Sequence, residues 1–159
     1  MANIEIKNVQ VKGKERENIL TKFKEVLAKW ALKMPEIKPL VLDFGLGHFY
    51  KEGLIEYWIA NEVEEGYCGK FLFVFDGQTC PYHHHVFKHE TFFVVKGRVI
   101  MNVNGKELIM RAGDIQVMSQ NTGHSFTGKG DALLLEVSKP CILKDSIFRN
   151  KLIGESGIV

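Results

Sequence analysis

The N-terminal part of the chain carries a helical pattern of apolar residues. Between Glu15 and Met34, apolar side chains recur every three or four positions, and Pro35 ends the pattern. Because residues at this spacing share one face of a helix, we expect one amphipathic helix here. Its apolar stripe is suited to pack on a core or on a partner subunit.

From Leu40 onward the pattern changes to short runs of β-branched and aromatic residues separated by turn residues. Eight runs are predicted to be strands, at residues 54–60, 70–75, 90–95, 98–103, 107–110, 114–118, 124–127 and 132–137. Asn104-Gly105 between two of them indicates an antiparallel hairpin, because a type I′ turn needs a positive φ at both central residues. Many short strands at close spacing favour a closed sheet or a two-sheet sandwich over βαβ units.

Composition limits the kind of protein that this chain can be. Its 159 residues fit one domain, and 45% hydrophobic with 25% charged residues is typical of an ordinary globular protein. A formal net charge of +2 provides no broad basic face for a nucleic acid or an anionic membrane. We therefore expect no role for nucleic acid or membrane.

The N-terminus and the cysteines indicate a reducing compartment. The opening MANIEIKNVQVKGKE has no apolar run suited to a signal peptide, and no stretch approaches the roughly 20 apolar residues of a membrane helix. Cys68, Cys80 and Cys141 form neither an even framework nor a CxxC pair. We expect a cytoplasmic protein with three free, buried thiols.

One segment, CPYHHHVFKHETFF, holds four of the six histidines. In an extended chain His83 and His85 point to one side, while His84 points to the other. Glu90 shares parity with the apolar Phe92, so its carboxylate faces the interior if that face is the core. An unpaired buried charge is costly, and a metal held by the two histidines would supply the partner.

A fourth ligand candidate, His124, lies in a later predicted strand and shares parity with Phe126. Three imidazoles and one carboxylate suit a divalent transition metal that keeps positions open for a substrate or water. A lone HxH pair on a strand is more often solvent-exposed than metal-bound, so the wider spacing of these residues matters.

That wider spacing resembles the cupin superfamily. Gly77, the pair His83 and His85, Glu90 and Gly97 fill every fixed position of the first cupin motif. The resemblance implies an all-β cupin fold, which is a double-stranded β-helix or jelly-roll barrel, here with an N-terminal amphipathic α-helix. We expect one cupin domain over residues 1–159, with a helical extension at 1–39 and the barrel at 40–150.

The second cupin motif is looser in this chain. Gly113 and His124 have the expected separation, but Ser119 stands where proline is usual and Asn121 where glycine is usual. Asparagine tolerates the left-handed conformation better than other non-glycine residues, so the turn is expected to survive. Gly128 replaces the final asparagine of the motif, and the ligand itself is untouched.

Short stretches over residues 43–148 resemble the small bacterial D-lyxose isomerase family. In chain order they are DFGLG, YC leading into GQTCP, KHETF, NT before the last histidine, and KDSIF. GQTCPxHxH and KxETF are the most specific. This family usually has longer insertions between the HxH and KxE segments and before the last histidine. Both loops are short here, and such loops commonly shape the sugar pocket.

The resemblance implies a manganese-dependent aldose–ketose isomerase acting on a free sugar such as D-lyxose or D-mannose. It also implies that Lys88 and Glu136 are functional, and that the metal ligands are His83, His85, Glu90 and His124. Fe²⁺, Co²⁺, Ni²⁺ and Zn²⁺ remain possible metals. Cupins frequently pair through sheet edges, so a homodimer is expected.

The residues also support this chemistry independently. Aldose isomerisation moves a proton between C1 and C2 through an enediolate, and a divalent cation stabilises the charged oxygens. Glu136 in the run ALLLEV is a carboxylate among leucines, where desolvation would raise its pKa towards that of a useful base. Lys88 has the parity of Glu90 and would hydrogen-bond a sugar oxygen. Exposure of Glu136 on an edge strand, and of Lys88 in a turn, are the alternatives.

Two other functions remain open at this stage. A three-histidine, one-glutamate set also serves non-haem iron dioxygenases, and some cupins bind sugars without catalysis. An apolar pocket that retains iron would favour the dioxygenase, and an absent metal would favour the binding protein. The roles of His48, His84 and His89 remain unassigned.

Overall fold

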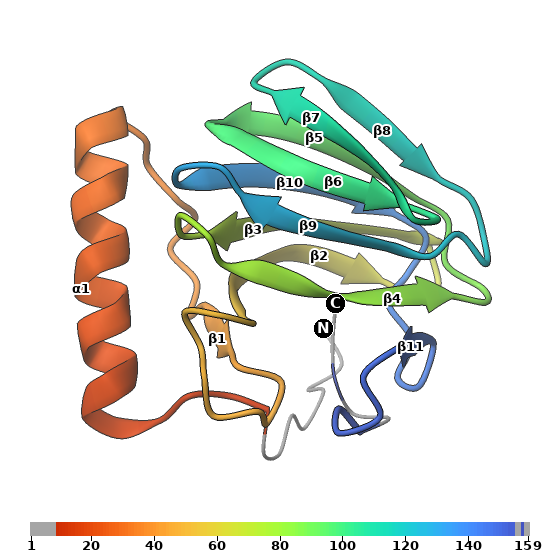
Figure 1. The fold of residues 1–159 in the computed structure, drawn as a ribbon, viewed down its shortest axis with the longest axis horizontal. Coiled ribbons are helices and arrows are strands. Elements are labelled where there is room, and N and C mark those ends of the chain that lie inside the picture. Colours follow the sequence, from red (N-terminus) through yellow and green to blue (C-terminus); the bar gives the residue numbers. More distant parts are fainter. Residues whose placement is uncertain (1–8, 155–156, 158–159) are drawn as a thin grey trace.

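Two antiparallel β-sheets face each other in the computed structural model, which describes residues 9–154 and 157 (Figure 1). The larger sheet has the order β1 (Leu40–Leu42), β2 (Leu54–Glu62), β3 (Tyr67–Val74), β10 (Ala132–Ser138), β5 (Glu90–Lys96) and β8 (Ile115–Met118). The smaller has the order β11 (Ser146–Phe148), β4 (Thr79–His85), β9 (His124–Gly128), β6 (Arg98–Val103) and β7 (Lys106–Arg111).

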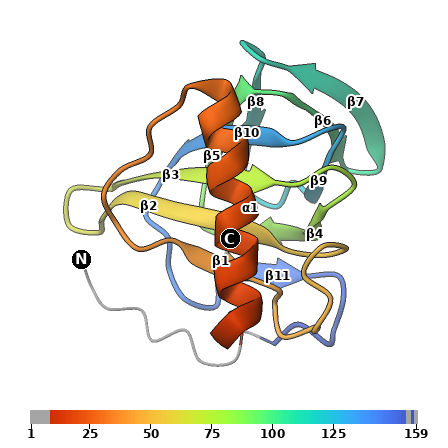
Figure 2. The same ribbon diagram turned by 90° about the vertical axis from the view of Figure 1, so that its left-hand side faces the viewer.

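Helix α1 (Gly13–Trp30) lies against the outer face of the larger sheet, across β2 and β3 (Figure 2). Its apolar stripe is buried there, and the ring centroids of Phe23 and of Phe73 on β3 are 4.6 Å apart. The helix ends earlier than the apolar pattern predicts, because Ala31 adopts a left-handed conformation with φ 52°. Leu32 and Met34 nevertheless pack on the same cluster, which is why the pattern continues past the helix.

All eight predicted strands form, and the structure adds three more in the part of the chain that it describes. Two of these, β1 and β11, are only three residues long, and β4 is the extended histidine segment itself. The predicted hairpin is confirmed: Val103 pairs with Lys106, and Asn104 and Gly105 have φ values of 51° and 84°. Asn121 also adopts the left-handed conformation expected of it, with φ 60°.

The interior between the sheets is apolar at one end and polar at the other. On β5, Phe92 and Val94 belong to the apolar cluster, while Glu90 at the start of the same strand is buried and charged. On β10, Leu134 is followed by Glu136 on the same face. Because side chains alternate along a strand, every second residue of β5 and β10 shares the interior face, and the buried residues of that face are apolar except for the glutamate near one end. The candidate site occupies this polar end.

Two expectations from composition bear on the compartment. The three cysteines are free and buried, as predicted. No helix among the described residues is both long enough and apolar enough to cross a membrane. The cytoplasmic location stays a prediction.

Gly97, between β5 and β6, provides a test of how closely this turn approaches the start of β10. It has φ 77°, and a Cβ there would overlap the carbonyl oxygen of Asp131 and lie 2.9 Å from the Cα of Ala132. We expect Gly97→Ala to lower the free energy of unfolding by about 2–4 kcal/mol, from backbone strain and overpacking together. Urea denaturation measures this loss.

Gly105 is the matched control for Gly97. It also has a positive φ, of 84°, but a Cβ there would meet nothing within 4 Å. Gly105→Ala should therefore cost only about 1–2 kcal/mol of strain. Equal losses in the two variants would show that the contact with the 131–132 backbone is unimportant.

Candidate metal centre

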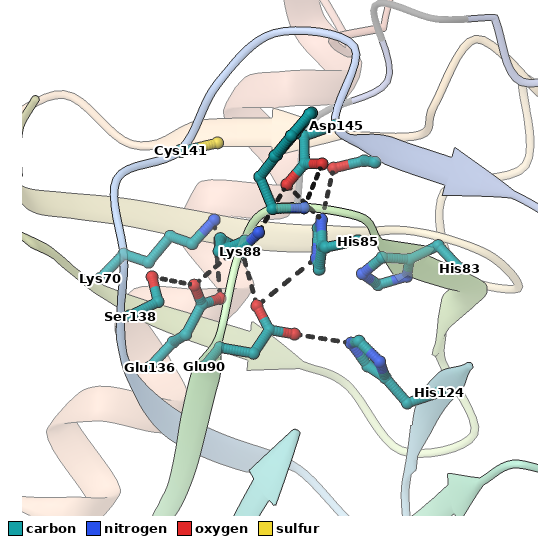
Figure 3. Close-up of polar contacts among 12 residues, drawn as sticks. Lys70, His83, His85, Lys88, Glu90, His124, Glu136, Ser138, Cys141 and Asp145 are labelled. Atoms are coloured by element: carbon teal, nitrogen blue, oxygen red, sulfur yellow. Dashed lines mark hydrogen bonds and ion pairs between the residues drawn. The ribbon is translucent and has the colours of Figure 1, made fainter. Parts of the chain in front are cut away.

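Four buried side chains from opposite sheets converge at the polar end of the interior (Figure 3). His83 and His85 come from β4 and His124 from β9, where His83 and His124 are paired in register. Glu90 faces them from β5 in the other sheet. One potential ligand atom from each residue lies within 4.8 Å of all the others. The structure thus brings together the complete predicted ligand set.

The outer ring nitrogens fix how two of the histidines face the centre. His83 Nδ1 lies 2.7 Å from the carbonyl oxygen of Pro81, and His124 Nδ1 lies 2.9 Å from that of Thr122. A carbonyl oxygen can only accept a hydrogen bond, so each Nδ1 carries the proton and each Nε2 presents a lone pair inwards. Outer partners of this kind are typical of metal-binding histidines.

The donor set fits a divalent metal ion. Within the described residues, the three Nε2 atoms and Glu90 Oε1 have no hydrogen-bond partner, although all are buried, while Glu90 Oε2 lies 2.9 Å from Lys88 Nζ. His124 Nε2 lies 2.8 Å from Glu90 Oε1, and His85 Nε2 lies 3.4 Å from Glu90 Oε2. A lone pair and a carboxylate oxygen at such distances need a shared proton or a cation between them. Imidazole and carboxylate ligands together suit a transition metal.

Proton binding is disfavoured at this cluster, which leaves the cation as the fitting partner. Burial lowers the pKa of His83 well below its usual value, and that of His85 to about 2. Burial alone would raise the pKa of Glu90, but Lys88 and the neighbouring histidines hold it well below the usual range. His83, His85 and Glu90 are therefore ready for a metal at ordinary pH, without first losing protons.

Asp145 fixes the turn that leads from β4 to β5. Its carboxylate accepts hydrogen bonds from the backbone N–H groups of Val86, Phe87 and Lys88, at 2.9–3.0 Å. It also lies 3.8 Å from Nδ1 of His85. One carboxylate before β11 thus holds the backbone that carries both a ligand and Lys88.

A row of alternating charges extends from the candidate ligands across the larger sheet, and Figure 3 shows its members as far as Lys70. We call it the charged row, and its members in order are Glu90, Lys88, Glu136, Lys70 and Glu56. Lys88 Nζ lies 2.9 Å from both Glu90 Oε2 and Glu136 Oε1. Lys70 Nζ lies 2.8 Å from Glu56 Oε1 and 3.6 Å from Glu136 Oε2. All five side chains are at most 2% exposed.

The two lysines of the row remain charged despite their burial. Burial alone would lower the pKa of Lys88, but Glu136 and Glu90 raise it above its usual value. Burial also acts to lower the pKa of Lys70, but Glu136 and Glu56 raise it well above the ordinary value. Burial also raises the pKa of Glu56, an effect that Lys70 partly offsets. The row is therefore held by ion pairs in a dry interior.

The structure separates the remaining histidines from the site. His84 points away from the ligand face and is only partly buried, and His89 is likewise outside the cluster. His48 lies on the surface, with its Nε2 2.8 Å from Glu52 Oε2. The expectation that His84 and His89 lie off the ligand face is met.

Glu136 and Lys88 meet directly, but the surroundings of Glu136 differ from those expected. Its carboxylate faces two ammonium groups and not only leucines. Sequence reasoning missed Lys70, Glu56 and Asp145. The first two had a usable signal, because each is a charged residue with the same parity as buried leucines in an apolar strand. Asp145 lies outside the predicted strands, and its sequence signal was its place in the family-like stretch KDSIF.

Comparison with known proteins agrees with this geometry. The cupin domain family matches residues 71–138. A D-lyxose ketol-isomerase of Thermofilum sp. is 32% identical over 137 residues, covering 68% of this chain and 74% of that protein. A D-lyxose/D-mannose isomerase of Thermosediminibacter oceani is 31% identical over 141 residues, covering 71% and 77%. This chain belongs to the D-lyxose ketol-isomerase family of cupins.

A solved structure extends the likeness to almost the whole chain. The L-ribose isomerase of Acinetobacter sp. DL28, in complex with L-ribose, has a TM-score of 0.73 over 96% of this chain and 98% of its own, at 15% identity. This supports the cupin fold from the N-terminal helix to the last strand. The cupin match at 71–138 spans the predicted site residues, whereas Glu56, Lys70 and Asp145 lie outside it.

The ligand set of this D-lyxose ketol-isomerase family member is testable without any substrate. We expect about one divalent metal ion per chain, and we expect the double variant His83→Ala, His85→Ala to lose it, because half of the donor atoms are removed. Elemental analysis after dialysis against Mn²⁺ measures the content. Chelation should also lower the melting temperature, since a metal that binds only the folded state stabilises it.

The double variant His84→Ala, His89→Ala is the control. It removes two histidines from the same segment but none from the cluster. It should retain the metal of the parent protein. Parental metal content in the His83, His85 variant would contradict the ligand assignment.

Proposed function

We propose that this protein is a metal-dependent aldose–ketose isomerase acting on a free sugar such as D-lyxose or D-mannose. The observation that carries the proposal is Glu136, a buried carboxylate that is joined through Lys88 to the ligand Glu90. A metal site and a non-ligand carboxylate side by side are what proton transfer between adjacent carbons requires. The names of the relatives support the same reaction.

The four clustered ligands are proposed to hold the metal, with Mn²⁺ as the first choice and Fe²⁺, Co²⁺, Ni²⁺ and Zn²⁺ as alternatives. When bound, a divalent cation supplies a Lewis acid that polarises the sugar oxygens and stabilises the charge of an enediolate. The four candidate ligands are buried, so such electrostatic effects are stronger there than in water.

Glu136 is proposed as the base that moves the proton between C1 and C2. Its Oε1 accepts hydrogen bonds from Lys88 Nζ and from Ser138 Oγ, both at 2.9 Å, which fixes the carboxylate plane. Its Oε2 accepts none from the described residues. Oε2 is therefore the oxygen that takes the proton from C2 and returns it to C1.

Lys88 is proposed to steady a substrate oxygen while it positions the base. It lies between a metal ligand and Glu136, and Asp145 holds its backbone N–H. A fixed ammonium at this place favours negative charge as it develops on the sugar oxygens.

The charged row favours a polyol substrate over the alternatives from sequence. A dioxygenase for an apolar substrate would need an apolar lining next to the ligands, whereas here Lys88, Glu136 and Lys70 continue from them. A non-catalytic sugar-binding protein has no need for a buried, positioned carboxylate beside a metal site. Isomerisation uses both groups.

The homodimer expected from sequence stays a prediction. The outer faces of β10, β5 and β8 carry exposed apolar side chains beyond the area that α1 covers: Phe93, Ile115, Val117 and Val137. A second copy is the partner that we propose for this face.

The reaction class is tested with purified, Mn²⁺-loaded protein. We expect interconversion of D-lyxose with D-xylulose, or of D-mannose with D-fructose, with no oxygen consumption. Chromatographic sugar analysis and an oxygen electrode measure the two quantities. Oxygen uptake coupled to loss of substrate, with no isomerisation, would favour the dioxygenase.

The base assignment is tested by Glu136→Gln, which keeps the size of the side chain and removes its basicity. Turnover should fall about 10²- to 10⁴-fold, the usual contribution of a positioned acid–base group, with metal content unchanged. Exchange of the C2 proton with deuterated water should fall with it. Parental turnover and exchange would exclude Glu136 as the base.

A further inference from the structure

The two oxygens of Glu136 have different environments. Oε1 is held by Lys88 and Ser138 at 2.9 Å, whereas Oε2 has only the ammonium of Lys70 nearby, at 3.6 Å. That distance is too long for a charge-assisted hydrogen bond, which has a length of about 2.7–2.9 Å. One oxygen is thus fixed and the other has no hydrogen bond from the described residues, in a side chain that is fully buried.

Lys70 lies between two carboxylates on neighbouring strands. It belongs to β3, Glu56 to β2 and Glu136 to β10, and β3 lies between the other two strands in the sheet. Its Nζ is 2.8 Å from Glu56 Oε1, and it lies over the ring of Trp58, 5.0 Å from the ring centroid. Both contacts are with β2, so the ammonium is drawn towards β2 and away from Glu136.

The position of this ammonium matters for the chemistry of Glu136. An ammonium in direct contact with Oε2 would occupy the oxygen that has to receive the proton, and it would stabilise the charged form of the carboxylate. Both effects weaken a base. Held at 3.6 Å, Lys70 still balances the buried charge without closing off Oε2.

We propose that Glu56 is a positioning residue for the isomerase, which holds Lys70 off Oε2 of Glu136 so that this oxygen stays free to accept the substrate proton. The inference rests on the proposed role of Glu136 as base. Glu56 acts through Lys70, and its part in the reaction requires no contact with the sugar or with the metal. Turnover then depends on a residue of β2, which lies three strands away from β5 in the sheet.

The test is Glu56→Gln in the full-length, Mn²⁺-loaded protein, with Glu62→Gln as control. Glu62 lies on the same strand but outside the charged row. Without the charge at position 56, Lys70 should turn to its remaining carboxylate. We expect kcat to fall about tenfold, with KM and metal content close to those of the parent, because base strength is weakened and binding is not. The control should have parental kcat.

Two further measurements separate this role from general damage to the fold. A crystal structure of the Glu56→Gln variant should show Lys70 Nζ within hydrogen-bond distance of Glu136 Oε2. In a Lys70→Gln background, adding Glu56→Gln should change kcat by less than about twofold, since effects through a shared partner are not additive. That double variant also removes both charges together, so neither is left buried and unpaired.

Three outcomes would overturn the inference: parental kcat in the Glu56→Gln variant, a Lys70 that stays beside position 56, or losses that multiply in the double variant. Failure of the proposed function has a different signature. If Glu136→Gln isomerises at the parental rate, the base assignment itself is wrong. If Glu136→Gln is inactive while Glu56→Gln is unaffected, only the role of Glu56 falls.

Discussion

The site depends on one constraint: charged side chains that are buried away from solvent have to be paired with opposite charges. Five charged side chains and three imidazoles lie at one end of the interior, where an unpaired charge costs several kcal/mol. The charged row meets this constraint by alternating its signs from Glu90 to Glu56. At the ligand end, Glu90 faces lone pairs of uncharged imidazoles, and a cation completes the alternation. Metal binding and the arrangement of the catalytic groups are therefore parts of one electrostatic arrangement.

The two sheets contribute differently to this arrangement. The smaller sheet supplies the three imidazoles, and contacts at Nδ1 hold those of His83 and His124 with Nε2 directed inwards. The larger sheet supplies the charged row, and α1 covers the outer face of the strands that carry Glu56 and Lys70. Covering both faces of β2 and β3 keeps water from the row, and this strengthens each ion pair and leaves the lysines charged. The N-terminal helix thus supports the site without touching it.

Side-chain hydrogen bonds, in addition to the sheets, hold the groups of the site in place. Asp145 binds three successive backbone N–H groups before β5, so Lys88 is held at both its backbone and its ammonium. Ser138 and Lys88 together hold one oxygen of Glu136. The base proposed here, which has to reach two adjacent carbons of one sugar, benefits from a carboxylate with one fixed oxygen and one oxygen that accepts no hydrogen bond from the described residues. This asymmetry is the feature that links the ion pairs to proton transfer.

Alternation along strands was enough to predict from sequence that His83, His85 and Glu90 face the interior, and motif spacing added His124. The turn at Asn104-Gly105 was equally local, since only its own φ angles decide it. The partners of Glu136 could not be predicted in this way. Parity tells which face a residue occupies, but β10 lies between β3 and β5, and this order results from long-range packing. The sequence by itself therefore determined the proposed ligands and the proposed base, whereas only the tertiary structure decided that Lys70 and Glu56 lie beside Glu136.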